Sequence, residues 1–93
     1  MQPTRRRSVA TTPPSRVDQA AALLSRLVSD SRGWDADTAA RDLGVRLTDE
    51  RLLRQLRARV VRAMLRLPLP SDARALATVD LTLAHHGANR AAA

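Results

Sequence analysis

Between residues 48 and 67 the apolar and polar positions alternate with the period of an amphipathic helix. On a helical wheel of about 100° per residue, the apolar side chains gather within an arc of about 120°. They are Leu52, Leu53, Leu56, Val60, Ala63, Met64 and Leu67. Six of the sixteen arginines occupy the rest of the wheel, namely Arg51, Arg54, Arg57, Arg59, Arg62 and Arg66. The pattern predicts one long helix, around which the chain is organised, with a buried face and an outward face of guanidinium groups.

Two apolar residues, Val61 and Leu65, break this pattern because they lie one turn apart inside the basic arc. Exposed apolar side chains that lie together favour cover from another helix or from a partner. With Leu69 and Leu81 they remain once the main stripes are buried. We expect Val61, Leu65 and Leu69 to form a partner surface, either a homodimer seam or a docking site for a larger protein.

Shorter periodic stretches predict two helices before the long one. The first runs from about Ser15 to Ser29, with Ser15 as its N-cap and Asp18 in the first turn. Gly33 follows it in a turn and is free to adopt the left-handed conformation that ends a helix. The second is short, about Ala36 to Leu43, with Asp35 as its N-cap and Gly44 as its end.

The long helix and the last helix have predicted boundaries of their own. Thr48 is expected to cap the long helix, and the Leu67-Pro68-Leu69-Pro70 segment ends it because proline cannot continue a helix. Ser71 is expected to cap a last helix from about Asp72 to His85, which Gly87 stops. The chain thus reads as an all-α domain, a small bundle of about four helices over residues 17–87. Residues 1–16 are expected to be a disordered basic arm and residues 88–93 a disordered tail.

Composition narrows the class of protein. The chain has 93 residues, no Cys and a single aromatic residue, Trp34. The absence of Cys excludes disulfides and thiolate metal sites, and no apolar run approaches the roughly 18 residues of a membrane span. Trp34 is better explained as a core anchor than as a ligand platform, since it is the only large side chain that can close the core. We expect a cytoplasmic protein with no cofactor and no membrane partner.

The net charge of +7 is unevenly distributed. Residues 17–93 carry 12 arginines and 9 acids, so their net charge is +3, and the remaining charge comes from Arg5, Arg6, Arg7 and Arg16. A basic arm on a mildly basic body is typical of proteins with polyanionic partners. The alternative is the codon bias of a GC-rich genome, because every basic residue is Arg and none is Lys. The arm itself could bind phosphate, present Ser8 to a kinase, or be a solvated tail.

The segment Ala39-Ala40-Arg41-Asp42-Leu43-Gly44-Val45 resembles the helix-turn-helix family of DNA-binding regulators. In that family an Ala faces the partner helix, a Leu precedes a Gly at the turn, and an apolar residue follows. The resemblance implies close crossing of two helices at Ala40 and a positive φ at Gly44. It covers seven residues and departs from the family at Glu50, where an apolar residue is expected. A tight corner between two helices would produce the same string.

If the resemblance holds, the groove-facing end of the long helix carries Arg46, Thr48, Arg51 and Arg54. These side chains could contact guanine edges or phosphates, while Arg5, Arg6 and Arg7 add backbone or minor-groove contacts. Catalysis is not expected, because Asp35, Asp49 and Asp72 all stand at helix starts instead of converging in a pocket. The neighbouring His85 and His86 diverge by about 100° on a helix and do not suit one metal ion.

Two functions therefore remain open. The first is a small nucleic-acid-binding regulatory protein, expected to be dimeric, that uses the arginine-rich helix and the basic arm. The second is a protein–protein interaction module, in which the arginines meet an acidic protein surface instead of phosphates.

Overall fold

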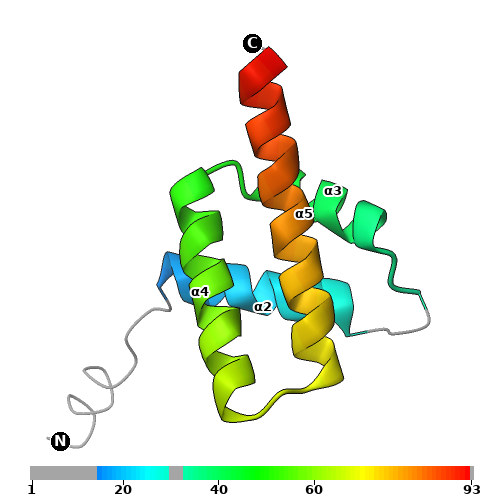
Figure 1. The fold of residues 1–93 in the computed structure, drawn as a ribbon, viewed down its shortest axis with the longest axis vertical. Helices are drawn as coiled ribbons and strands as arrows, with labels where there is room; N and C mark the ends of the chain where they lie inside the picture. Colours follow the sequence, from blue (N-terminus) through cyan, green and yellow to red (C-terminus); the bar gives the residue numbers. More distant parts are fainter. Residues whose placement is uncertain (1–14, 30–32, 93) are drawn as a thin grey trace, which may run out of the picture.

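The computed structural model describes residues 15–29 and 33–92, with side chains up to residue 88. This part of the chain folds into four helices: α2 (Arg16–Val28), α3 (Ala36–Arg46), α4 (Glu50–Arg66) and α5 (Pro70–Ala92). The prediction of a small all-α bundle is confirmed (Figure 1). Most of the predicted basic arm, including the arginines at positions 5–7, lies outside the described residues.

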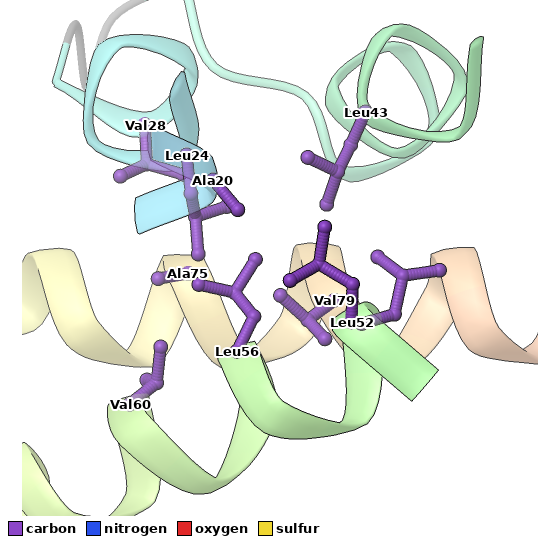
Figure 2. Packing of buried hydrophobic residues seen from close by; sticks show 10 residues of the cluster. Ala20, Leu24, Val28, Leu43, Leu52, Leu56, Val60, Ala75 and Val79 are labelled. Atoms are coloured by element: carbon purple, nitrogen blue, oxygen red, sulfur yellow. The ribbon is translucent and has the colours of Figure 1, made fainter. Parts of the chain in front are cut away.

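The helices form two layers (Figures 1 and 2). α4 and α5 run antiparallel in one layer, joined by residues 67–69, and α2 and α3 cross behind them. α5 packs against each of the other three helices, whereas α3 and α4 do not pack against each other. The central element is therefore α5, and the prediction that the long arginine-rich helix organises the chain is wrong.

The core forms where the two layers face each other (Figure 2). Its fully buried large side chains include Leu43 of α3, Leu53 and Leu56 of α4, and Val79 of α5. The apolar stripe predicted for α4 is buried from Leu52 to Val60, but Leu67 beyond its end is 63% exposed. The prediction that Leu67 belongs to the buried face is wrong, because α4 ends at Arg66 and the chain turns away there.

Two buried threonines of α5 hold a polar strip inside this core. Thr78 and Thr82 are almost completely buried, and their hydroxyl groups donate to the carbonyls of Arg74 and Thr78 at 2.8 and 2.7 Å. Bonding one turn back along the same helix satisfies hydroxyls that would otherwise be costly to bury. Trp34 packs against the core and donates its indole N–H to the Thr78 hydroxyl at 3.3 Å. Its predicted place in the core is thus what the structure shows.

The side chains that close the helix ends agree only partly with the prediction. Ser15 and Asp18 form a capping box at α2, and the Asp35 carboxylate caps α3 by accepting from the Thr38 N–H at 3.0 Å. α4 is capped by Asp49 and not by Thr48, because the Asp49 carboxylate accepts from the Arg51 N–H at 3.0 Å. An aspartate satisfies these first N–H groups while also placing negative charge at the positive end of the helix dipole.

The boundaries predicted at glycines are wrong. α3 passes through Gly44 to Arg46, α5 passes through Gly87 to Ala92, and no described glycine has a positive φ. Gly33 is expected from the sequence to be left-handed, but it does not have a positive φ either. α5 also begins at Pro70, before the predicted Asp72, since proline suits a first helical position where no N–H bond is needed.

Arg74 of α5 caps the C-terminal end of α2 with a side-chain hydrogen bond. Its Nε donates to the carbonyl of Val28, the last residue of α2, at 3.1 Å. The last carbonyls of a helix lack partners within the helix, so a cation there satisfies both a hydrogen bond and the helix dipole. α5 thereby fixes the end of α2 as well as its buried face.

Replacing Gly44 by Ala should stabilise the protein. A Cβ at this position would lie 3.6 Å from Thr82 Cγ2, an ordinary van der Waals contact, and the backbone is helical. Alanine is favoured over glycine within a helix by about 0.5–1 kcal/mol, which urea unfolding would detect. Gly87→Ala is the matched control near the free end of α5. A decrease in the stability of Gly44→Ala would contradict a helical Gly44 that has room for a Cβ beside Thr82.

Candidate nucleic-acid interface

The predicted nucleic-acid residues that the structure describes lie where α3 ends and α4 begins. Arg46 is the last residue of α3, Thr48 lies in the connection, and Arg51 is in the first turn of α4. All three side chains are exposed. Arg54 is on the next turn, where its guanidinium forms an ion pair with Glu50. The predicted set is therefore brought together, but Arg54 is already neutralised.

A hollow of about 380 Å³ between α2 and the α3–α4 connection lies beside these residues. Arg16 and Arg26 of α2 and Arg46 of α3 line it, and we call these three residues the arginine cluster. Its other lining residues are mostly apolar: Gln19, Ala20, Leu23, Leu47 and Leu52. All three arginines are exposed, so their guanidinium groups are accessible to an anion that enters the hollow from solvent.

The arginine cluster keeps most of its charge unpaired. The Arg16 guanidinium lies 3.6 Å from the Asp49 carboxylate, and both side chains are substantially exposed. Within the described residues, Arg26, Arg46 and Arg51 have no carboxylate partner. An exposed, long ion pair such as Arg16–Asp49 contributes little to stability. Another anion could therefore readily replace Asp49 as the partner of Arg16.

The arginines further along α4 divide into paired and unpaired groups. Arg57 pairs with Asp80 of α5, and Arg59 pairs with Asp18 of α2, because the two neighbouring helices place carboxylates along both edges of α4. In the described part of the chain, Arg62 and Arg66 have no such partner. The predicted outward face of free guanidinium groups is thus wrong for the middle of α4.

Sequence reasoning missed Arg26 and assigned Arg16 to the arm. Arg16, Gln19, Leu23 and Arg26 follow one another at intervals of three, four and three residues, so they share one side of α2. That spacing could have placed both arginines on the same side of α2. The hollow itself could not have been found this way, since it depends on where Arg46 is brought by α3.

The predicted partner residues lie around the α4–α5 turn. Leu65 is 81% exposed and Leu69 is 47% exposed, whereas Val61 is half-buried. Leu67, which the periodicity assigns to the core, joins them as an exposed leucine. An exposed group of large apolar side chains at one end of a small protein is a candidate interaction surface.

The geometry implied by the helix-turn-helix resemblance is not found. Gly44 and Val45 are both helical, Val45 is 80% exposed, and the connection between α3 and α4 comes later, at residues 47–49. Ala40 faces α5 and not α4, since its carbonyl oxygen lies 3.3 Å from the Thr82 hydroxyl. Small residues at positions 40 and 44 therefore let α3 approach α5 closely. The family resemblance itself stays a prediction.

The comparisons with known proteins add no relative. No family model, no curated protein and no solved structure matches this chain. Among the described residues, no helix is both long enough and apolar enough to cross a membrane. In the same part of the chain, no group of three His, Asp or Glu side chains is placed to hold a metal ion.

The ion pair between Asp18 and Arg59 should make stability depend on pH in the acid range. The Arg59 guanidinium, helped by the Ser15 hydroxyl and N–H, lowers the pKa of the Asp18 carboxyl below its ordinary value. A carboxyl whose folded pKa is depressed stabilises the protein above its unfolded pKa, and that contribution disappears as pH falls through the folded value. The free energy of unfolding should therefore decline from about pH 5 downward.

Asp18→Asn should flatten this acid dependence, because an amide does not titrate. Urea unfolding of both proteins from about pH 2 to about pH 7 would measure it. Asp42→Asn, at an exposed position in α3, is the matched control. An equal decline in the wild type and in Asp18→Asn would contradict a role for this carboxyl.

Proposed function

We propose that this protein is a small nucleic-acid-binding regulatory protein that contacts phosphates through the arginine cluster and Arg51. The observation that carries the proposal is the hollow lined by Arg16, Arg26 and Arg46. Guanidinium groups suit phosphate oxygens because they present several N–H donors in one plane. The basic arm at residues 5–7 would add charge to the same interaction.

The spacing of the cluster suits a polymer better than a single small anion. Arg16 and Arg26 are ten residues apart on α2, which corresponds to about 15 Å along the helix axis. Phosphates follow one another at about 3.4 Å of axial rise per strand, so this reach covers several of them. Arg16 and Arg26 would therefore engage different phosphates of the same strand, and Arg46 would add a third contact from α3.

The distribution of free charges favours binding to the phosphate backbone over insertion of α4 into a groove to contact the bases. The arginines in the middle of α4 pair with the carboxylates of Glu50, Asp80 and Asp18. Only its N-terminal end, with Arg51, offers a charge free of ion pairs beside the cluster. Contacts of this kind position a protein on nucleic acid without selecting a sequence, so we expect weak sequence preference.

Removing arginines from the cluster should reduce both the affinity for duplex DNA and its salt dependence. The double variant Arg26→Ala/Arg46→Ala should lower the slope of log K against log salt by about 0.9 for each phosphate that the protein no longer neutralises. Fluorescence anisotropy with a labelled duplex at several salt concentrations would measure this. Arg62→Ala/Arg66→Ala is the matched control, because it removes the same charge from exposed, unpaired positions outside the hollow.

Each result of this titration bears on the proposal. An equal decrease in affinity in both double variants would show that net charge alone drives binding and would overturn the role of the hollow. No binding by the folded wild type at low salt would overturn the nucleic-acid function as a whole. A parallel titration with single-stranded RNA would establish which polymer is preferred.

A second candidate function is a protein–protein interaction module, and the exposed leucines favour it. Leu65, Leu67 and Leu69 present large apolar side chains close to the unpaired Arg62 and Arg66. An acidic protein with an apolar pocket would be complementary to such a surface. Under this function, substitutions in the arginine cluster would leave partner capture unchanged, whereas substitutions at Leu65 would abolish it.

A further inference from the structure

A second hollow, of about 490 Å³, lies between α3 and the C-terminal half of α5. Its polar lining residues include Arg41, Thr48, His85 and His86, and we call this site the α3–α5 hollow. Each of these four side chains can donate a hydrogen bond, and within the described part of the chain no carboxylate lines the hollow. An anion is therefore complementary to it.

The rest of the lining is small and mostly apolar. Ala40, Gly44 and Val45 belong to α3, which lies beside the upper part of α5 in Figure 1. Thr82 of α5 donates its hydroxyl to the Thr78 carbonyl, and its methyl group lies toward Gly44. The side-chain contacts to a bound anion would therefore come from the arginine, the Thr48 hydroxyl and the two histidines.

The cationic groups on the α3 side of the hollow are not neutralised. Arg41 is exposed, and among the described residues neither it nor either histidine forms an ion pair. The nearby carboxylates on α3 are exposed at Asp37 and Asp42, and neither pairs with Arg41. The carboxylate of Asp35 is engaged at the other end of α3, where it caps the helix.

The start of α4 lies level with this end of α5, because the Arg57–Asp80 ion pair sets the register of the two antiparallel helices. The two carboxylates at that start are both engaged. Glu50 pairs with Arg54, and Asp49 accepts hydrogen bonds from the first N–H groups of α4. α4 thus brings no unengaged carboxylate to the histidines.

The α3–α5 hollow adjoins the hollow of the arginine cluster. Arg46 and Leu47 line the hollow of the arginine cluster and Thr48 lines the α3–α5 hollow, so the α3–α4 connection separates the two. Two residues span at most about 7 Å, which is about two steps of the 3.4 Å axial rise of one strand. One nucleic-acid strand that lies across the connection would therefore bring phosphates to both hollows.

We propose that the α3–α5 hollow is a second phosphate-binding site for the nucleic acid that the arginine cluster contacts, strengthened when His85 and His86 are protonated. This inference rests on the proposed function. Imidazole gains its charge as the pH falls from about 8 to about 6, a range in which arginines and ordinary carboxylates stay charged. The two rings leave α5 about 100° apart, so they would contact different phosphate oxygens while Arg41 approaches from α3.

Lowering the pH from about 8 to about 6 should strengthen binding to duplex DNA roughly fivefold. The slope of log K against log salt should steepen by up to about 0.9 for each histidine that neutralises a phosphate. His85→Gln/His86→Gln should bind as the wild type does at pH 8 and lose the gain at pH 6. Fluorescence anisotropy with a labelled duplex would measure both quantities, and circular dichroism would verify that the variant is folded.

Arg26→Ala/Arg46→Ala is the matched control for the pH effect. These two arginines line the other hollow, so this variant should bind more weakly at both pH values and keep the gain at pH 6. A gain that persists in His85→Gln/His86→Gln, or wild-type binding that does not change with pH, overturns the inference and leaves the proposed function standing. Absence of binding at both pH values overturns the proposed function and this inference with it.

Arg41→Ala tests the α3 side of the site without changing a group that titrates in this range. It should lower the salt slope by about 0.9 at either pH. Arg62→Ala is its control, since Arg62 is exposed, has no carboxylate partner in the described chain and lines neither hollow. Equal effects of the two substitutions would show that net charge alone acts and would overturn the role of the hollow.

Nuclear magnetic resonance distinguishes a polymer phosphate from free phosphate. The chain has only two histidines, so their imidazole C–H signals can be followed directly. At pH 6 these signals should shift with a short DNA duplex and shift far less with inorganic phosphate at the same phosphate concentration. An equal response to inorganic phosphate, or no response to the duplex while it binds, would overturn the assignment of this hollow to the polymer.

Discussion

The close approach of α3 to α5 is the contact on which the arrangement of this protein depends. α3 and α4 do not pack on each other, so α5 must hold both of them, with α2 completing the second layer. Thr78 and Thr82 make this possible, since their hydroxyls bond back along α5 and leave small, satisfied side chains facing α3. On the α3 side, Ala40 and Gly44 add little bulk. A pair of large residues at either place would push α3 away and open the core around Leu43.

The same arrangement of helices determines which arginines have no carboxylate partner and can bind an external anion. α2 and α5 border α4 on its two edges, and each provides one aspartate that pairs with an arginine of α4. Arginines occur along the whole of α4, but these ion pairs in its middle separate the unpaired arginines into two regions. One unpaired region lies at the α2–α3–α4 end, around Arg46, and the other lies near the α4–α5 turn, around Arg66. The exposed Leu65 lies at this second region, since it lines the same hollow as Arg62 and Arg66.

Local features of this fold could be predicted from the sequence, and features that join distant segments could not. Ser15 and Asp35 cap their helices because a cap is decided by a few neighbouring residues. The apolar stripe of α4 follows from its period. Glycine is a common helix end, yet tertiary packing and good flanking helix formers carry α3 through Gly44 and α5 through Gly87. The ion pairs between α4 and its two neighbours join residues far apart in the chain, and no spacing rule indicates them.

The residues of the candidate site could likewise be predicted only where they are close together in the sequence. Arg46 and Arg51 could be identified because the chain brings them together over a short connection. Arg26 reaches Arg46 only through the crossing of α2 behind α4, which depends on the whole bundle. Leu67 is exposed for a related reason, since periodicity continues to Leu67 but the helix does not.

The indole of Trp34 has a consequence for observing this protein. It is the sole tryptophan in a chain without Tyr or Phe, and from its place just before the start of α3 it donates a hydrogen bond to the hydroxyl of Thr78. Intrinsic fluorescence therefore comes from one known place and reports on one event, the detachment of α3 from α5. Motions elsewhere in the bundle would leave that emission largely unaltered, so the protein carries its own site-specific optical probe.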